Sequence, residues 1–251
     1  MILSATIIGR THRIMQQNCQ DFAVGNVIDS DAAFGLVLDG CGSKYRDATG
    51  TYPANNEVGA NLLGSFAAAF LSKQKTKNGK QKTENEEFVL DDIVARLYRA
   101  CVTYLDCLIM LHPFQDDFER RRFVATRLLC TLVGFVMTEE TAVCFWSGDG
   151  YLGINDEIIS LDSNNHPDYL AYQVLDGGKY GESNGRFNTL TIRDRNNLNR
   201  LIVATDGWQA TQLQQLVQPQ NSLSLQRWMN TQARERGNFE DDGAIAFYFH
   251  E

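Results

Sequence analysis

Residues 35–43 read GLVLDGCGS, an apolar run that ends abruptly in a glycine-rich turn. The run at 36–38 predicts a short, fully buried strand. The glycines that flank Cys41 allow the backbone to turn sharply and to bring its carbonyl groups close to a ligand. Asp39 therefore lies at the end of a predicted strand, where its carboxylate can hold a metal ion.

Acidic residues recur where other predicted strands begin or end. The buried strand predicted at 201–204 runs into Asp206-Gly207, which repeats the pattern of an apolar run followed by Asp-Gly. Asp149 lies between two glycines at a predicted turn, and Asp241 comes at the start of the final predicted strand. These acids are candidates for the same site as Asp39.

A predicted hairpin supplies one more acid. Asp21 precedes a strand that returns through a turn expected at 29–31, and the partner strand ends at Asp39. The two carboxylates are therefore expected at the same end of one sheet.

Acids gathered in this way would need cations. A single Asp at a strand-turn junction is more often a turn former than a ligand, because its side chain bonds nearby backbone N–H groups. Four that converge would repel one another and could stay ionised only beside divalent cations, and an all-oxygen set selects Mg²⁺ or Mn²⁺ over zinc. Two such ions about 4 Å apart can lower the pKa of a bridging water and stabilise an in-line displacement at phosphorus. The four acids are Asp21, Asp39, Asp206 and Asp241.

Periodic apolar residues predict the elements around these acids. Helical spacing predicts amphipathic helices at 57–70, 88–110, 208–217 and 222–236. In the first of them, Val58, Leu62 and Phe66 fall on one face. Three β-rich segments with short connections, at 123–138, 141–147 and 151–154, predict an antiparallel meander, which excludes a doubly wound parallel sheet.

Length and composition predict one domain over residues 1–251, because 43% hydrophobic residues can form a sizeable core. Polar insertions are expected near 44–55 and 73–87. The polar segment near 162–188 is expected to form a functional flap, since so long a connection is uncommon in a compact domain.

Charge and residue usage exclude several classes of protein. The net charge of -8 argues against nucleic acid or an anionic membrane as a partner. The sequence has no apolar stretch of about 18 residues and no signal-peptide pattern, so we expect a cytoplasmic protein, working as a monomer. The six cysteines include no Cys-x-x-Cys pair and predict reduced, mostly buried thiols, and the four histidines lack zinc-site spacing.

Five motifs, taken in order, resemble those of the metal-dependent type-2C serine/threonine protein phosphatases, in particular the bacterial branch with a Gly-x-x-His start. The resemblance spans nearly the whole chain, and each motif would be weak alone. The matching segments are 9–21, 37–43 with 56–60, 146–150, 204–207 and 241–245.

The resemblance implies an α+β fold, a four-layer α-β-β-α sandwich with two central antiparallel sheets. It also implies that Asp39 bridges two Mn²⁺ or Mg²⁺ ions, and that a hydroxide between the ions attacks phosphoserine or phosphothreonine in a protein substrate. Asp39 and Asp206 would then be the catalytic residues. The implied ligands are Asp21 and the Gly40 carbonyl for one ion, Asp206 and Asp241 for the other, and Asp149 for a third ion.

Two positions depart from the family pattern. Cys41 stands where many members carry a histidine thought to protonate the leaving group, and Met15 stands where many carry a phosphate-binding arginine. His12 or Arg13 is the candidate replacement for that arginine, with a surface role as the alternative. These departures leave open a catalytically silent module with the phosphatase fold, whereas a two-metal nuclease is disfavoured by the acidic composition.

Overall fold

The computed structural model describes residues 1–29, 32–42, 46–47, 50–74, 86–162, 168–175 and 185–250. The predicted hairpin turn at 29–31, most of the insertion near 73–87 and the middle of the flap near 162–188 lie outside the described residues. Part of the insertion near 44–55 is described and contains two short paired strands, β4 (Arg46–Asp47) and β5 (Gly50–Thr51).

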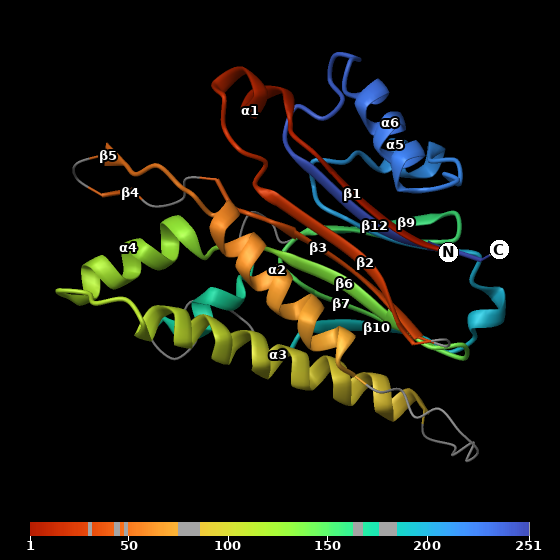
Figure 1. Ribbon diagram of the computed structural model, residues 1–251, viewed down its shortest axis with the longest axis horizontal. Helices are drawn as coiled ribbons and strands as arrows, with labels where there is room; N and C mark the ends of the chain where they lie inside the picture. The colour runs from red at the N-terminus through yellow and green to blue at the C-terminus, as the bar shows by residue number, and fades with distance from the viewer. Residues whose placement is uncertain are drawn as a thin grey trace.

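Two five-stranded antiparallel sheets form the centre of the molecule (Figure 1). The first sheet has the order β1-β12-β11-β8-β9 and the second β10-β7-β6-β3-β2. The first contains β1 (Ile2–Ile7), β8 (Gly150–Ile154), β9 (Glu157–Leu161), β11 (Arg200–Ala204) and β12 (Gly243–Phe249). The second contains β2 (Asp21–Asp29), β3 (Ala32–Asp39), β6 (Leu132–Met137), β7 (Ala142–Ser147) and β10 (Asn188–Ile192).

Helices cover the outer faces of both sheets, which confirms the α-β-β-α sandwich (Figure 1). Helices α2 and α3 pack on the second sheet, and α5 and α6 pack on the first. The helices are α1 (Arg10–Met15), α2 (Glu57–Ser72), α3 (Glu86–Met110), α4 (Asp117–Arg127), α5 (Ala210–Gln215) and α6 (Ser222–Gln232), with short 3-10 helices η1 (Leu170–Val174) and η3 (Arg195–Asn197).

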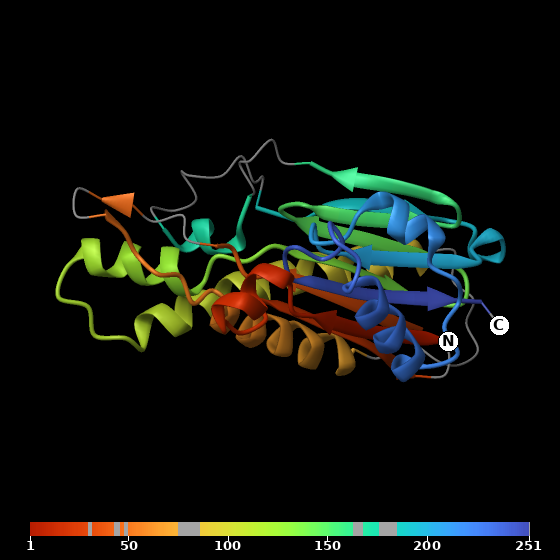
Figure 2. The same ribbon diagram turned by 90° about the horizontal axis from the view of Figure 1, so that it is seen from above.

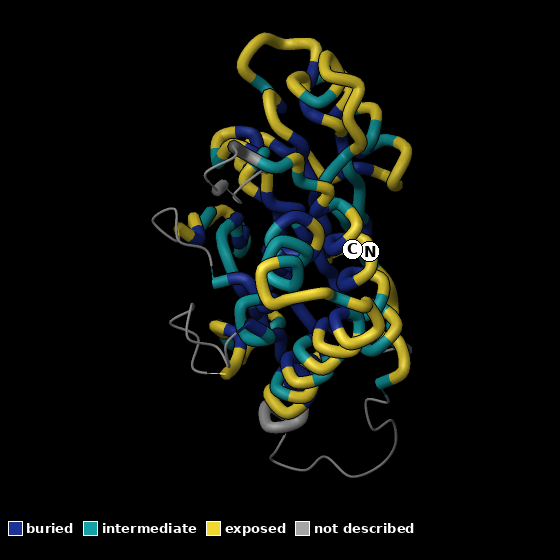
Figure 3. Tube along the Cα trace, turned by 90° about the vertical axis from the view of Figure 1, so that its left-hand side faces the viewer, coloured by how far each residue is buried: buried dark blue, intermediate teal, exposed yellow. Residues whose placement is uncertain are grey.

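Alternation along β3 explains why its sequence is apolar throughout. Leu36 and Leu38 pack against the helices, whereas Val37 points into the layer between the two sheets. Because successive side chains of a strand point to opposite faces, a strand covered on both sides must be apolar at every position. The buried residues accordingly concentrate in the middle of the molecule (Figure 3).

The two ends of the sandwich differ. The chain termini lie side by side at one end, where the N-terminal amine of Met1 donates to the Phe249 carbonyl at 2.7 Å. Helix α4 and the β4–β5 pair extend from the opposite end (Figure 2). The strand ends that carry the predicted site lie on the α4 side.

The predicted meander is wrong at its third strand. β6 and β7 pair as expected, but β8 joins the other sheet beside β11. Gly148 and Gly150 adopt φ values of 94° and 141°, which only glycine adopts readily, and they carry the chain from one sheet to the other.

The strand predicted over 123–138 is wrong at its beginning, because residues 123–127 belong to α4. Asp116 caps this helix by accepting from the Glu119 amide, and acids in the first turn with a basic residue in the last suit the helix dipole. Helix α1 and strand β10 were not predicted. Helix α1 has only six residues and none of them is buried, and β10 is a short strand that is partly exposed, so neither has a clear apolar pattern.

Helix α2 turns a different face inward than Val58 and Leu62 suggest. Val58 and Leu62 are 42% and 39% exposed, while Gly64 faces the sheet on the side of the helix that also carries the buried Leu63, Ala67 and Leu71. A Cβ at Gly64 would lie 2.4 Å from the Phe22 ring, so the helix approaches β2 too closely for larger residues.

Candidate functional site

Asp21 and Asp39 face each other across neighbouring strands, as the hairpin prediction required. They are register partners at the end of β2 and β3. Thr205, which follows β11 in the other sheet, donates its hydroxyl to the Asp21 Oδ2 at 2.6 Å and accepts from the Ala244 amide at 2.8 Å. One threonine therefore ties the acid of one sheet to the strand ends of the other.

The turn after Asp39 is fixed by the segment that follows α4. The Asp39 amide donates to the Thr131 hydroxyl at 3.2 Å, and the Thr131 amide donates to the Asp39 carbonyl at 2.9 Å. A Cβ at Gly40 would lie 2.8 Å from the Gln20 carbonyl oxygen, so only glycine fits where the turn touches the residue before Asp21.

Asn56 is buried beneath this turn, and its role was not predicted. Its side chain donates to the Cys41 carbonyl at 2.7 Å and accepts from the Leu129 amide at 3.1 Å. Although Asn56 directly precedes α2, its side chain makes no capping hydrogen bond to that helix. Asn56 instead joins the turn after β3 to the end of α4.

The acids raise one another's pKa. Burial, followed by the charges of Asp206, Asp241 and Asp149, raises the pKa of Asp39 from 3.8 to about 8. Burial and the Asp39 charge raise the pKa of Asp21 well above its usual value. With a pKa of about 8, Asp39 holds a proton at neutral pH when no cation is bound. An all-oxygen set of close carboxylates is suited to Mg²⁺ or Mn²⁺.

Asp149 lies in the turn that crosses between the sheets. The preceding Ser147 donates its hydroxyl to the Asp168 carbonyl, which ties this turn to the described start of the predicted flap. Tyr169 follows in that segment and is buried beside Cys41, within the same apolar cluster. Asp168 and Tyr169 of this segment therefore lie beside the site.

The two adjacent acids before β12 point in different directions. The Asp241 side chain is 75% exposed, while Asp242 is buried. Asp242 accepts from the Gly9 amide at 2.6 Å and from the Gln20 amide at 2.5 Å, and the His12 Nδ1 lies 2.8 Å from its Oδ2. Asp242 falls within the motif at 241–245, and residue type alone does not distinguish its buried position from the exposed one of Asp241.

Among the described residues, one trio of His, Cys, Asp and Glu side chains has ligand atoms all within 4.8 Å of one another, namely His12, Asp241 and Asp242. The predicted metal set is looser: Asp21 and Asp39 are register partners, and Asp206 and Asp241 are near enough for their charges to act on Asp39.

The predicted phosphate-binding residues lie on α1. The Arg13 guanidinium donates to the Ala233 carbonyl at 3.5 Å, and the His12 Nδ1 faces Asp242. Met15 is 62% exposed, and the buried Cys41 thiol donates to the Gly42 carbonyl at 3.2 Å. A contact of His12 or Arg13 with phosphate stays a prediction.

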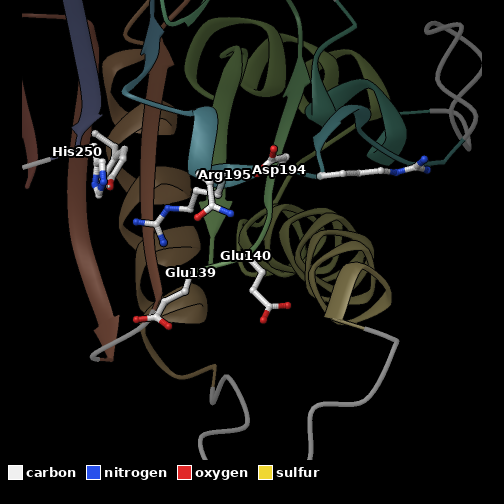
Figure 4. A pocket seen from close by; sticks show the side chains of 8 residues that line it. Glu139, Glu140, Asp194, Arg195 and His250 are labelled. Atoms are coloured by element: carbon white, nitrogen blue, oxygen red, sulfur yellow. Dashed lines mark hydrogen bonds between the residues drawn. The ribbon is translucent and has the colours of Figure 1, made fainter.

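A second hollow lies at the other end of the sandwich, between the β6–β7 turn, η3 and the end of β12 (Figure 4). Arg195 crosses it, donating to the Thr138 carbonyl and lying 4.8 Å from the centre of the Tyr248 ring. Because β12 starts at the acids and ends here, about 20 Å separates the two places. This hollow lies at the end of the sandwich away from the acids and is not part of the acidic site.

Comparison with known proteins agrees with the motifs. The chain matches the family model described as protein phosphatase 2C over residues 8–240. No curated protein matches it. No described helix is both long and apolar enough to span a membrane.

Solved structures share the fold at low sequence identity. The serine/threonine phosphatase Stp1 from Staphylococcus aureus has a TM-score of 0.62 at 12% identity, covering 100% of this chain and 94% of that one. The S. agalactiae serine/threonine phosphatase has a TM-score of 0.61 at 15% identity, covering 100% and 99%. The catalytic domain of the phosphatase PstP, solved with two manganese ions, has a TM-score of 0.60 at 15% identity, covering 98% and 96%.

Proposed function

This chain belongs to the protein phosphatase 2C family, and we propose that it hydrolyses phosphoserine or phosphothreonine in a protein substrate with the help of bound divalent ions. The observation that carries the proposal is the state of Asp39, whose pKa is raised to about 8 by burial and by Asp206, Asp241 and Asp149. Carboxylates that raise one another's pKa in this way are suited to cations and not to an anionic phosphate alone.

We assign the ligands as the resemblance implies, with Asp39 shared between two ions. PstP, which has the same fold, was solved with two manganese ions. The proposed ligands are Asp21 and the Gly40 carbonyl for one ion, Asp206 and Asp241 for the second, and Asp149 with Asp206 for a weaker third.

When bound, Mn²⁺ or Mg²⁺ ions supply a water that is acidified for attack on phosphorus and positive charge beside the phosphoryl oxygens. The residues of the chain prepare for this. The Thr205 hydroxyl donates to one carboxylate oxygen of Asp21. Thr131 bonds both the backbone amide and the backbone carbonyl of Asp39. Because the pKa of Asp39 is raised to about 8, metal binding should release a proton at neutral pH.

A second candidate function is a catalytically silent module with the phosphatase fold. It is favoured by Cys41, a buried thiol where many members place a histidine, and by the exposed Met15 where many place an arginine. In the main proposal, by contrast, the active enzyme is a monomer in the cytoplasm.

Activity after metal depletion tests the proposal. Chelator-treated protein should be inactive toward a phosphopeptide and p-nitrophenyl phosphate, and Mn²⁺ should restore hydrolysis. Asp39→Asn should be nearly inactive, while Asp106→Asn, an exposed acid on α3, should match the unmodified protein. Absence of hydrolysis with both Mn²⁺ and Mg²⁺ contradicts the enzyme, and absence of Mn²⁺ binding by calorimetry favours the silent module.

A further inference from the structure

A buried carboxylate joins the two ends of the chain beside the acidic site. We call this arrangement the Asp242 node: the Asp242 carboxylate, the backbone amides of Gly9 and Gln20, and the His12 ring. One Asp242 oxygen accepts from the Gly9 amide at 2.6 Å, and the other accepts from the Gln20 amide at 2.5 Å and lies 2.8 Å from the His12 Nδ1. The donors are more than 220 residues from Asp242 along the chain.

The node contacts both ends of the segment between Gly9 and Gln20. Helix α1, which lies between Gly9 and Gln20, has no buried residue. Its first turn is attached by the Arg10 amide, which donates to the Phe239 carbonyl at 2.9 Å. At its start, Gly9 packs so closely on the Asp241 backbone that a Cβ would lie 2.2 Å from the Asp241 carbonyl carbon. At the far end, the Gln20 amide donates to the Asp242 oxygen, and the Gln20 carbonyl accepts from the Gly40 amide at 3.1 Å.

The node also links two proposed metal ligands. Gln20 immediately precedes Asp21, and Asp242 immediately follows Asp241. The Asp242 amide in turn donates to the Asp241 Oδ1 at 2.8 Å. The contact from Gln20 to Asp242 therefore fixes the backbone of Asp21 relative to that of Asp241.

His12 supplies the side-chain partner of Asp242 in the node. Its Nδ1 is buried and lies 2.8 Å from the Asp242 Oδ2. The nearest second acid is Asp241, with its Oδ1 at 3.9 Å. A buried carboxylate keeps its place when its charge is compensated, and removing one partner of such a pair is costly.

We propose that His12 is a positioning residue: through Asp242 it holds Gln20 and Asp21 in place relative to Asp241, so that the proposed metal ligands are set before a divalent cation arrives. The inference rests on the proposed function for the meaning of those ligands. It gives His12 a task different from gripping phosphate, because the ring nitrogen that it uses faces inward.

Two substitutions of similar size separate these tasks. The amide nitrogen of asparagine takes the place of the histidine Nδ1, whereas that of glutamine takes the place of Nε2. If the node is the function of His12, His12→Gln should weaken Mn²⁺ binding by about 10-fold to 100-fold, the range for residues that orient metal ligands, and His12→Asn by less than about 3-fold. Calorimetry with Mn²⁺ alone measures both, with Asp106→Asn as the unchanged control.

Two other results would overturn the proposal. Equal Mn²⁺ affinities in His12→Asn and His12→Gln, or an unchanged Mn²⁺ affinity with a raised KM for a phosphopeptide, would assign His12 to phosphate or to the surface. If the variants unfold, amide hydrogen exchange of the unmodified, metal-free protein decides: the Gly9 and Gln20 amides should be strongly protected, and rapid exchange at both contradicts the node.

The result does not depend on turnover. If the Mn²⁺ affinity falls strongly in His12→Gln and little in His12→Asn, but the unmodified protein hydrolyses no phosphopeptide, the role of the node is supported while the proposed enzymatic function fails. Hydrolysis with equal Mn²⁺ affinities in the two variants would have the reverse meaning.

Discussion

Replacing Asp39 by asparagine should stabilise the metal-free protein while it removes activity. Burial and three neighbouring carboxylates raise the pKa of Asp39 from 3.8 to about 8. At neutral pH the folded state therefore binds a proton that the unfolded chain has lost, and this uptake costs free energy. Asparagine has the shape of the protonated acid and needs no proton.

The size of the effect follows from the pH. For an acid whose pKa is raised on folding, the penalty is absent below the unfolded pKa and grows until the pH reaches the folded pKa. At about 1.4 kcal/mol for each pH unit, the ceiling at about pH 7 is about 4 kcal/mol. Asp39 is only half-buried and shares its protonation with Asp21, so we expect about 1 to 3 kcal/mol, or about 3 to 9 °C in Tm.

Urea unfolding followed by circular dichroism, in the presence of a chelator, measures this difference. The advantage of Asp39→Asn over the unmodified protein should shrink to below about 1 kcal/mol near pH 4.5, where the penalty has nearly vanished. Added Mn²⁺ should stabilise the unmodified protein more than the variant. A variant that is less stable at neutral pH, or a difference that does not change with pH, would refute the reasoning.

Two further substitutions test the contacts that hold the site. Thr205→Val removes the donor to Asp21 and should lower the free energy of unfolding by about 1 to 3 kcal/mol, whereas Thr205→Ser should lose less because it keeps the hydroxyl. Asn56→Ala leaves the Cys41 carbonyl and the Leu129 amide without their side-chain partner and should cost about 2 to 4 kcal/mol. Urea midpoints measure both, and values equal to the unmodified protein contradict these contacts.

The pairing of Asp21 with Asp39 could be predicted because it depends on local signals. An apolar run, a predicted turn and a second run place two strand ends together whatever surrounds them, and the register confirms it. The part of the site that comes from the other sheet was harder to predict. After β7 the chain crosses to the other sheet at two glycines with positive φ, where β8 pairs with β11. Nothing in the sequence of β7 signals this change of sheet.

The buried face of α2 shows a different limit. Large apolar residues usually mark the inner face of a helix, as Leu63 and Leu71 do here, but the same face also carries Gly64, which meets the Phe22 ring. The distance between the helix and the sheet decides which face is buried, and that distance depends on residues from another part of the chain. Val58 and Leu62 are therefore left partly exposed.

The acids at 241 and 242 show why a motif does not by itself assign its residues. Two identical side chains in sequence point to opposite sides at the start of a strand, and burial decides that Asp241 faces outward and Asp242 inward. Gly207 contributes to that choice, since a Cβ there would lie 1.6 Å from the Asp242 carbonyl oxygen. Gly9, Gly207 and His12 thus pack around Asp242 and the backbone that carries Asp241. The positions of the proposed ligands are set by this long-range packing, and the local sequence supplies only their chemistry.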